Sequence, residues 1–156
     1  MRIYVVRHGP AEDNAPSGKD FDRALTAPGR ERVRDVARAL AKQDEVPRVI
    51  LTSPLVRALQ TAEVIAAELG VTSVETSRDM APGGDALTLA RGLIARQRKR
   101  TMLVGHQPDL TLLIESLTEE RFPHDMLKGM VVGLVAQDGG RISTRFVLDP
   151  KSLQLV

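Results

Sequence analysis

The segment Arg2-Ile3-Tyr4-Val5-Val6-Arg7-His8-Gly9 decides the fold of this chain. Its run of β-branched and aromatic residues, Ile3–Val6, is typical of a β-strand that is buried on both faces. Such a strand must lie inside a sheet that later segments complete. Because open α/β sheets bind ligands at the carboxyl ends of their strands, Arg7, His8 and Gly9 would stand at a ligand site. The alternative is an ordinary polar turn in which Gly9 supplies backbone freedom, and these residues alone favour neither interpretation.

Length and composition predict one soluble, cytoplasmic domain that spans residues 1–156. The chain has no Cys, which excludes disulfides, a thiolate nucleophile and cysteine zinc sites. Lys plus Arg number 22 against 20 Asp plus Glu, and a formal net charge of +2 gives no indication of nucleic-acid binding. No segment approaches the ~20 apolar residues of a membrane span, and the N-terminal apolar run is too short for a signal peptide.

Helix-start signals follow the first strand and the second. Thr26 is a favourable N-cap, and Pro28 falls in the first turn of the helix that it would begin. A second strand is expected at 49–51. After it, Ser53 is a favourable N-cap and Pro54 a favourable first residue of a second helix.

Arg57 would lie in the first turn of that second helix, beside the positive end of the helix dipole. A cation is unfavourable there unless an anion binds between it and the free N–H groups of the helix. The position of Arg57 therefore indicates an anion site. Gly70 is the expected residue at the end of the same helix.

The remaining elements complete a three-layer α/β/α domain with a mostly parallel central sheet and an antiparallel C-terminal hairpin. Gly105 and His106 again put a glycine turn and a histidine at a strand end, whereas His124 lies in a polar loop and is expected at the surface. The Asp-Gly turn at 138–139 predicts the hairpin. The expected ranges are a strand at 71–74, a third helix after the turn at 80–85, a strand at 102–104, a helix with apolar positions from 110 to 117, and strands at 130–136 and 142–148.

Residues 10–25 form a long loop that follows the Arg7-His8-Gly9 turn. Loops of this length are often functional, so we expect this one to border the site. Arg23 could reach back from it towards an anionic ligand, and a plain surface arginine is the alternative.

Three strand ends thus carry Arg7 with His8, Arg57, and His106. If the strands are neighbours, two guanidinium groups and two imidazoles converge, which suits a tetrahedral dianion such as phosphate. A zinc site would also use histidines. The two guanidinium groups would repel the metal, however, and no carboxylate accompanies both histidines, so phosphate is the better ligand.

Four segments resemble the histidine phosphatase (phosphoglycerate mutase-like) superfamily and occur in that family's order. They are Val6-Arg7-His8-Gly9, Leu25-Thr26-Ala27-Pro28-Gly29, Ser53-Pro54-Leu55-Val56-Arg57-Ala58-Leu59-Gln60-Thr61 and Gly105-His106. The short length and the segment Pro82-Gly83-Gly84-Asp85 are similar to the SixA-type phosphohistidine phosphatase branch.

The resemblance implies that His8 is the nucleophile and becomes phosphohistidine during turnover. It implies that Arg7 and Arg57 hold the phosphoryl oxygens, that His106 completes the pocket, and that neither a metal nor an organic cofactor is needed. Many members carry a Glu general acid after the third strand. The short segment 76–87 offers only Asp79 and Asp85. Asp85 is the better placed of the two, but an N-cap for the third helix is the preferred interpretation of this residue.

We therefore expect a phosphatase that acts on phosphohistidine in a protein partner, with no nucleic-acid or membrane partner. One alternative is a phosphatase for a small phosphorylated metabolite. The other is a catalytically silent module that binds phosphate or a phosphoprotein, although all four pocket residues are present.

Overall fold

The computed structural model describes all 156 residues of the chain. Its elements in chain order are β1 (Arg2–Arg7), η1 (Asp20–Asp22), α1 (Ala27–Lys42), β2 (Val49–Thr52), α2 (Val56–Leu69), β3 (Val74–Thr76), η2 (Arg78–Met80), α3 (Ala86–Ala95), β4 (Thr101–Gly105), α4 (Asp109–Thr118), β5 (Val131–Ala136) and β6 (Ile142–Leu148).

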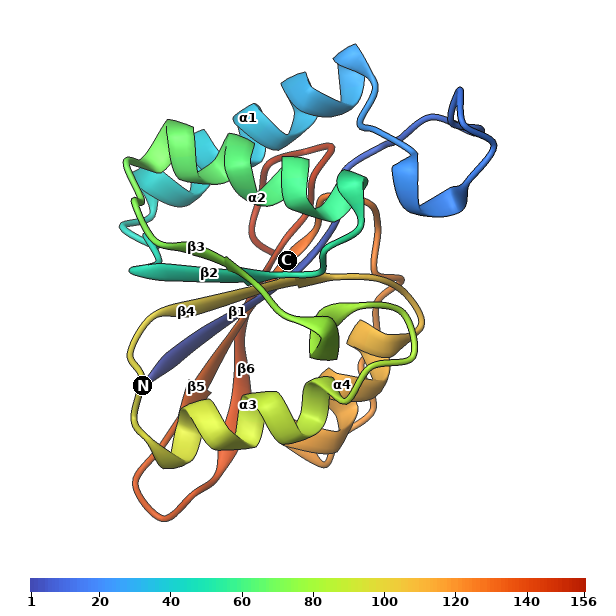
Figure 1. Cartoon of the computed structure of the whole chain (residues 1–156). Helices are drawn as coiled ribbons and strands as arrows, with labels where there is room; N and C mark the ends of the chain where they lie inside the picture. The colour runs from blue at the N-terminus through green and yellow to red at the C-terminus, as the bar shows by residue number, and fades with distance from the viewer.

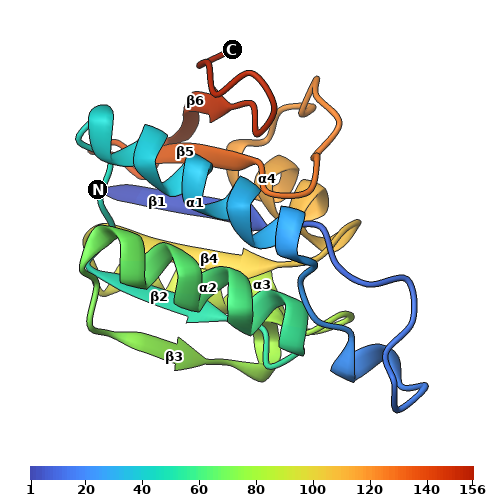
Figure 2. The same ribbon diagram turned by 90° about the horizontal axis from the view of Figure 1, so that it is seen from above.

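The six strands form one sheet in the order β3-β2-β4-β1-β5-β6. The pairs β2–β3, β2–β4 and β1–β4 are parallel, and the pairs β1–β5 and β5–β6 are antiparallel. Helices α1 and α2 cover one face of the sheet, and α3 and α4 cover the other (Figure 1, Figure 2). The structure therefore confirms the three-layer α/β/α fold with its mostly parallel sheet and antiparallel C-terminal hairpin.

Strand β1 lies inside the sheet and contributes to both hydrophobic cores. Ile3 and Val5 belong to the core on the α3 and α4 side, whereas Tyr4 and Val6 belong to the core under α1 and α2. All four side chains are at most 1 % exposed. Burying each of them contributes about 1.5–3 kcal/mol, which explains why this strand has no polar residue between its ends.

Three predicted helix caps are confirmed. The Oγ1 atom of Thr26 accepts a hydrogen bond from the backbone N of Gly29 at 2.9 Å. Gly70 ends α2 in the left-handed conformation, with φ of 71°. The Oδ1 atom of Asp85 accepts from the backbone N of Thr88 at 3.1 Å, so Asp85 is the N-cap of α3.

The predicted start of α2 is wrong. The helix begins at Val56, with Leu55 at the N-cap position and no side-chain cap. Ser53 does not cap the helix and Pro54 is not its first residue. Instead, Ser53 Oγ lies 2.7 Å from His106 Nε2 and accepts from the backbone N of Leu55 at 3.2 Å. Local sequence signals do not reveal such a contact, because His106 follows a different strand.

The predicted third strand is also misplaced, since β3 begins at Val74 rather than Val71. The backbone N of Val71 donates to the carbonyl of Ala66 at 2.9 Å and so belongs to the turn that ends α2. Pairing with β2 begins only where Val74 lies opposite Ile50. The other five strands differ from their predicted ranges by at most one residue at an end.

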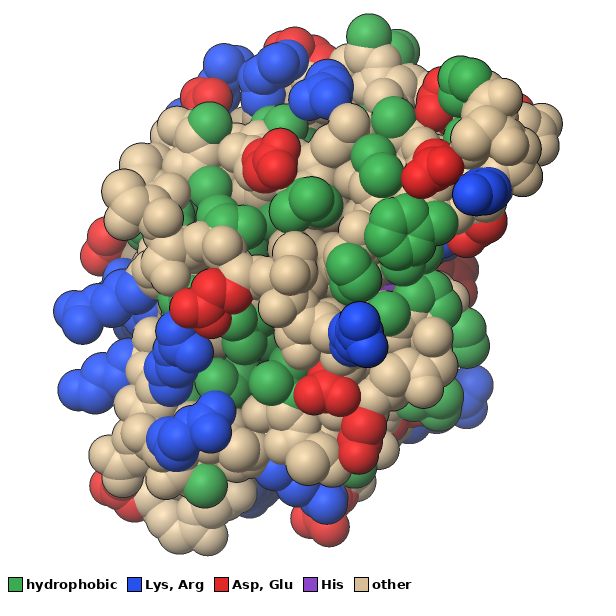
Figure 3. All heavy atoms as spheres, in the orientation of Figure 1, with side chains coloured by type: hydrophobic (Ala, Val, Ile, Leu, Met, Phe, Trp, Pro, Cys, Tyr) green, Lys and Arg blue, Asp and Glu red, His purple; other side chains and the backbone are tan.

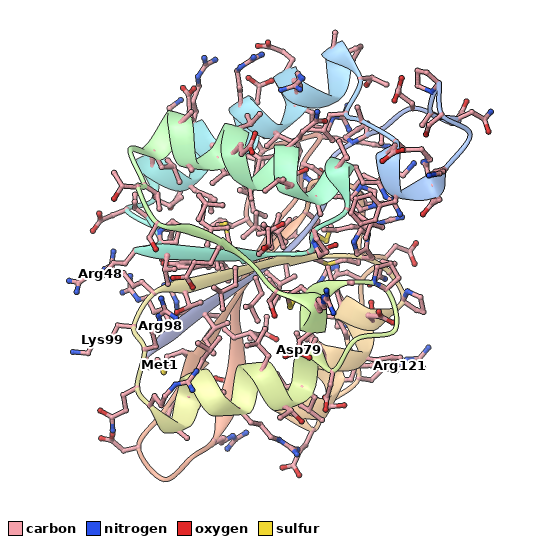
Figure 4. All side chains as sticks on the ribbon, in the orientation of Figure 1. Met1, Arg48, Asp79, Arg98, Lys99 and Arg121 are labelled. Carbon is pink, nitrogen blue, oxygen red and sulfur yellow. The ribbon has the colours of Figure 1, made fainter.

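Cations gather at the end of the sheet where β1 begins. Figure 4 shows Arg48, Arg98 and Lys99 there, and Figure 3 shows blue side chains along the same edge. This end lies away from the carboxyl ends of the parallel strands.

His124 is exposed, as predicted. No helix combines the length and the apolar character needed to cross a bilayer.

Candidate active site

The carboxyl ends of β1, β2 and β4 meet at one edge because β4 lies between the other two strands. Arg7 pairs with Gly105, and the backbone N of His8 donates to the carbonyl of Gly105 at 3.1 Å. This pairing brings together the segments that carry the two predicted histidines. The ring centroids of His8 and His106 are 5.3 Å apart. The two residues are 6 % and 4 % exposed, so both are buried.

The His8 ring is fixed in one orientation and one tautomer. Its Nδ1 atom lies 2.8 Å from the carbonyl oxygen of Gly9. A carbonyl oxygen only accepts, so Nδ1 carries the proton and Nε2 keeps its lone pair. Burial first, and then the charges of neighbouring groups such as Arg57, lower the pKa of His8 to about 3. The imidazole is therefore neutral near pH 7, which makes Nε2 a competent nucleophile.

Gly9 is required at this turn by a close approach and not by backbone freedom. A Cβ atom at this position would lie 2.6 Å from the Cγ2 atom of Val33 in α1. Its φ is not positive, so the alternative in which Gly9 supplies backbone freedom finds no support. The backbone N of Gly9 donates to Thr61 Oγ1 at 3.0 Å, and Thr61 Oγ1 donates to the carbonyl of Arg57 at 2.8 Å. The turn after β1 is thus tied to the first turn of α2.

The protein anchors both arginines through their terminal nitrogens. Arg7 Nη1 donates to the carbonyl of Met126 at 2.8 Å. Arg57 Nη1 donates to the carbonyl of Asp20 at 3.0 Å, and Arg57 Nη2 donates to Asp20 Oδ2 at 3.2 Å. The Nε atoms of both arginines are buried and have no partner in the protein. Each guanidinium is therefore fixed by hydrogen bonds from its terminal nitrogens, while its Nε–H group stays available to a ligand.

His106 is held in a similar way. Its Nε2 atom contacts Ser53 Oγ, whereas its Nδ1 atom is buried without a partner. Burial first, and then the charge of Arg57, lower the pKa of His106 to about 4, so this imidazole is also neutral near pH 7.

The three nitrogens without partners are Arg7 Nε, Arg57 Nε and His106 Nδ1, and they are the only buried side-chain polar atoms of the chain in that condition. Leaving a buried polar group unsatisfied typically costs about 1–3 kcal/mol, so three of them in one place indicate a ligand with several acceptor oxygens. Two cations among them favour an anion. A tetrahedral oxyanion placed near His8 Nε2 meets both requirements.

Among the carboxylates, only Asp20 is hydrogen-bonded to one of these four residues, Arg57. A hydrogen bond from Arg23 and the charge of Arg57 lower its pKa, against an opposing effect of burial. The carboxyl is therefore ionised near neutral pH and cannot donate a proton as a general acid there. Loop 10–25 borders the site through this residue, in agreement with the expectation from its length and position.

The other two candidate site residues, Arg23 and Asp85, lie at the periphery. Arg23 Nε donates to the carbonyl of Glu12 at 2.6 Å, and Arg23 Nη1 donates to Asp20 Oδ1 at 2.9 Å. The carboxylate of Asp85 is engaged by Thr88 at the start of α3 and is exposed. These contacts support the loop and the helix, and a substrate contact by Arg23 or Asp85 remains a prediction.

Sequence reasoning missed the supporting contacts of Ser53, Thr61, Asp20 and the Met126 carbonyl. Ser53 and Thr61 lie within a segment that was already singled out, so their positions carried a signal. Asp20 begins the short helix η1 inside loop 10–25, where no sequence pattern indicated its contact, and a backbone carbonyl has no sequence signature. No group of three or more His, Cys, Asp or Glu side chains in the structure could hold a metal ion. Independence of metal remains a prediction.

Residues 3–81 match the family model of the histidine phosphatase superfamily (branch 1). The chain belongs to the histidine phosphatase superfamily. It is thus a phosphatase by family. It is 38 % identical over 140 residues to an uncharacterised protein of Picosynechococcus sp. (strain ATCC 27264 / PCC 7002 / PR-6), covering 86 % of this chain and 84 % of that protein. It is 25 % identical over 159 residues to the phosphohistidine phosphatase SixA of Escherichia coli (strain K12), covering 99 % of this chain and 98 % of SixA.

Solved structures agree with this membership. The protein histidine phosphatase SixA complexed with tungstate superposes with a TM-score of 0.89 at 25 % identity, covering 99 % of this chain and 100 % of that one. A mycobacterial glucosyl-3-phosphoglycerate phosphatase shares the fold, with a TM-score of 0.69 at 18 % identity and coverage of 92 % and 96 %.

Proposed function

We propose that this phosphatase forms a phosphohistidine intermediate on His8 and removes phosphate from phosphohistidine on a protein partner. The observation that carries the proposal is the set of three buried nitrogens without partners, on Arg7, Arg57 and His106, around a neutral imidazole. The complex of the related SixA with tungstate, a tetrahedral oxyanion, supports the same kind of ligand in this pocket.

In the first step, the lone pair of His8 Nε2 attacks phosphorus in line with the leaving group. A new P–N bond forms on His8 while the P–N bond of the substrate breaks. The Nε–H groups of Arg7 and Arg57 and the Nδ1 atom of His106 stabilise charge on the equatorial oxygens. The imidazolium that forms on His8 keeps its Nδ1 proton, and the Gly9 carbonyl stabilises it through the 2.8 Å hydrogen bond.

In the second step, water attacks phosphorus and the P–N bond to His8 breaks. The electron pair of that bond returns to Nε2, and a proton of the water passes to phosphate or solvent. His8 is left neutral with its proton on Nδ1, ready for another cycle. Neither step requires a metal, so we expect full activity in the presence of EDTA, and loss of activity that one divalent ion restores would contradict this.

The choice of phosphohistidine rests on the leaving group. An alcohol leaves as an alkoxide and needs a proton from a general acid. The imidazole of phosphohistidine can carry a proton on its distal nitrogen and leave as a neutral molecule. Asp20 is ionised and Asp85 is engaged as a helix cap, so neither offers a carboxylic acid near neutral pH. Such a site favours phosphohistidine over alkyl phosphates.

The second candidate function is a phosphatase for a small phosphorylated metabolite, which the shared fold with a glucosyl-3-phosphoglycerate phosphatase favours. The two differ in a phosphate-release assay with a phosphohistidine protein, an alkyl phosphate and an aryl phosphate. We expect turnover to be fastest on phosphohistidine, intermediate on the aryl phosphate and slowest on the alkyl phosphate. Asp85→Asn should leave phosphohistidine turnover nearly unchanged.

Equal turnover of alkyl phosphate and phosphohistidine, together with selective loss of the alkyl activity in Asp85→Asn, would make Asp85 the general acid. The metabolite phosphatase would then be the correct assignment. Binding of phosphate without turnover of any substrate would instead identify a silent phosphate-binding module.

A further inference from the structure

Two hydroxyl side chains lie at the end of β2, from its last residue Thr52 and from Ser53 directly after it, and only one of them contacts the site. Thr52 Oγ1 donates to the backbone carbonyl of Ser53 at 3.1 Å. Ser53 Oγ instead lies 2.7 Å from His106 Nε2. Both residues are 0 % exposed, so neither hydroxyl contacts bulk solvent. Ser53 is therefore the one side chain that contacts the imidazole of His106 through a hydrogen bond.

Counting protons gives the direction of this hydrogen bond. The backbone N–H of Leu55 donates to Ser53 Oγ at 3.2 Å and occupies one lone pair of that oxygen. If His106 Nε2 also donated to this oxygen, the hydroxyl proton of Ser53 would be buried with no acceptor. A buried polar hydrogen without an acceptor is unfavourable. The arrangement that satisfies every group has the Ser53 hydroxyl donating to His106 Nε2.

A neutral imidazole carries one ring proton, so a ring that accepts at Nε2 has its proton on Nδ1. The Nδ1 atom of His106 is buried and has no partner in the protein, like the Nε atoms of Arg7 and Arg57. Burial and the charge of Arg57 lower the pKa of His106 to about 4, which agrees with a ring that carries a single proton near pH 7.

We propose that Ser53 is a positioning residue that holds His106 in the tautomer protonated on Nδ1, so that His106 donates to a phosphoryl oxygen. This inference rests on the proposed function for its catalytic consequence, but not for the tautomer itself. In this tautomer, all three nitrogens without partners are hydrogen-bond donors. In the other tautomer, the Nδ1 lone pair would face the phosphoryl oxygens and repel them.

The first test reads the tautomer directly in the resting protein. Long-range ¹H–¹⁵N correlation spectra of the imidazole rings distinguish a ring protonated on Nδ1 from one protonated on Nε2. We expect the Nδ1 form for His106 in the wild type, with its signal assigned by its loss in His106→Gln. The exposed His124 provides an internal reference for an unconstrained ring. A wild-type His106 protonated on Nε2 would overturn the proposal.

The second test removes the hydroxyl. Ser53→Ala should shift the His106 tautomer towards Nε2–H and lower kcat by roughly 10²-fold, the scale of losing one donor to developing charge, with a much smaller change in KM. Ser53→Thr retains a hydroxyl and should restore both readouts. Thr52→Val is the matched control, because it removes a buried hydroxyl that does not contact His106, and it should change neither.

An unchanged tautomer in Ser53→Ala would contradict the role of Ser53 even if activity fell. An inactive wild-type protein whose His106 is protonated on Nδ1, and loses that preference in Ser53→Ala, would instead reject the proposed function while supporting the positioning by Ser53. The spectra and the assay therefore separate the two failures.

Discussion

Two clusters of this chain place arginine side chains around buried groups, and they differ in how completely the protein satisfies the hydrogen bonds of those buried groups. In the first, Glu45 is 5 % exposed and its carboxylate contacts side chains from β1 and β6. Its Oε2 atom accepts from Tyr4 OH at 2.7 Å and from Arg2 Nη1 at 3.5 Å, and its Oε1 atom accepts from Arg145 Nη2. No buried atom of this cluster lacks a partner.

The second cluster is the candidate active site, where cations and imidazoles outnumber carboxylates. Asp20 balances part of the charge through Arg57, yet Arg7, Arg57 and His106 each keep a buried nitrogen without a partner. The Glu45 cluster thus contributes to the stability of the fold, whereas the candidate active site leaves three buried nitrogens that the proposed anion would satisfy. Counting hydrogen-bond partners separates a structural cluster from a ligand site where residue types alone do not.

The largest expected effect on turnover is that of a substitution at His8, in the candidate active site. His8→Ala removes the proposed nucleophile and should lower kcat by at least roughly 10⁴-fold, or about 5 kcal/mol. Acid-labile, base-stable phosphate should be trapped on wild-type protein and not on the variant. His124→Ala, which changes an exposed histidine, is the control and should behave as the wild type. Label in His8→Ala would show that another residue is the nucleophile.

The second prediction concerns the pH dependence of the free energy of unfolding, to which the two clusters should contribute differently. The pKa values of His8 and His106 are about 3 and about 4, below the 6.5 of an unfolded chain. The unfolded state therefore binds more protons, and the free energy of unfolding falls as the pH falls below about 6.5. Between about pH 7 and pH 5 the loss should be about 2 kcal/mol for each histidine, or about 4 kcal/mol together.

The Glu45 cluster should contribute nothing in that window. Although burial acts to raise the pKa of Glu45, hydrogen bonds from Arg145 and Tyr4 outweigh it and the pKa is lowered. Its contribution to stability is therefore lost only in more acidic solution. Denaturant unfolding at several pH values measures the slope, which His8→Ala should roughly halve. A slope that is the same in His8→Ala and in wild type would show that His8 is not buried in its neutral form.

The third prediction concerns Arg57. Arg57→Lys keeps the charge but loses the planar fork that holds Asp20 on one side and presents Nε on the other. We expect kcat/KM to fall roughly 10²-fold, which corresponds to a loss of about 3 kcal/mol of transition-state stabilisation. Arg38→Lys, on a surface arginine paired with Glu68, is the matched control. Unchanged kinetics in Arg57→Lys would exclude Arg57 from the phosphoryl site.

The smallest expected effect tests the structural cluster. Glu45→Gln removes the charge that balances Arg2 and Arg145, and the free energy of unfolding should fall by about 2 kcal/mol, below the usual range for a fully buried pair because both arginines are partly exposed. Turnover by the folded protein should stay at the wild-type value. Glu68→Gln, in a surface ion pair, should change stability by less than about 1 kcal/mol. A large loss of kcat in Glu45→Gln would remove the distinction between the clusters.

Local chemistry was sufficient for much of the fold. The apolar run Ile3–Val6 predicted a strand covered on both faces, and Thr26, Gly70 and Asp85 marked helix ends that the structure confirms. These features were predictable because they depend on residues close together in the chain. The family resemblance and the four main candidate site residues were available from the sequence for the same reason, since each motif is a short continuous segment.

Only the tertiary structure decided how these segments support one another. Ser53 has the chemistry of an N-cap, but the sheet order places β4 beside β2, so its hydroxyl contacts His106 instead. Asp20 and the Met126 carbonyl reach Arg57 and Arg7 from loops that are distant in sequence. A side chain with several possible partners bonds to the group that strand order and packing bring within about 3 Å of it. Contacts between residues far apart in the chain have no local signal, and here they determine which nitrogens remain for the ligand.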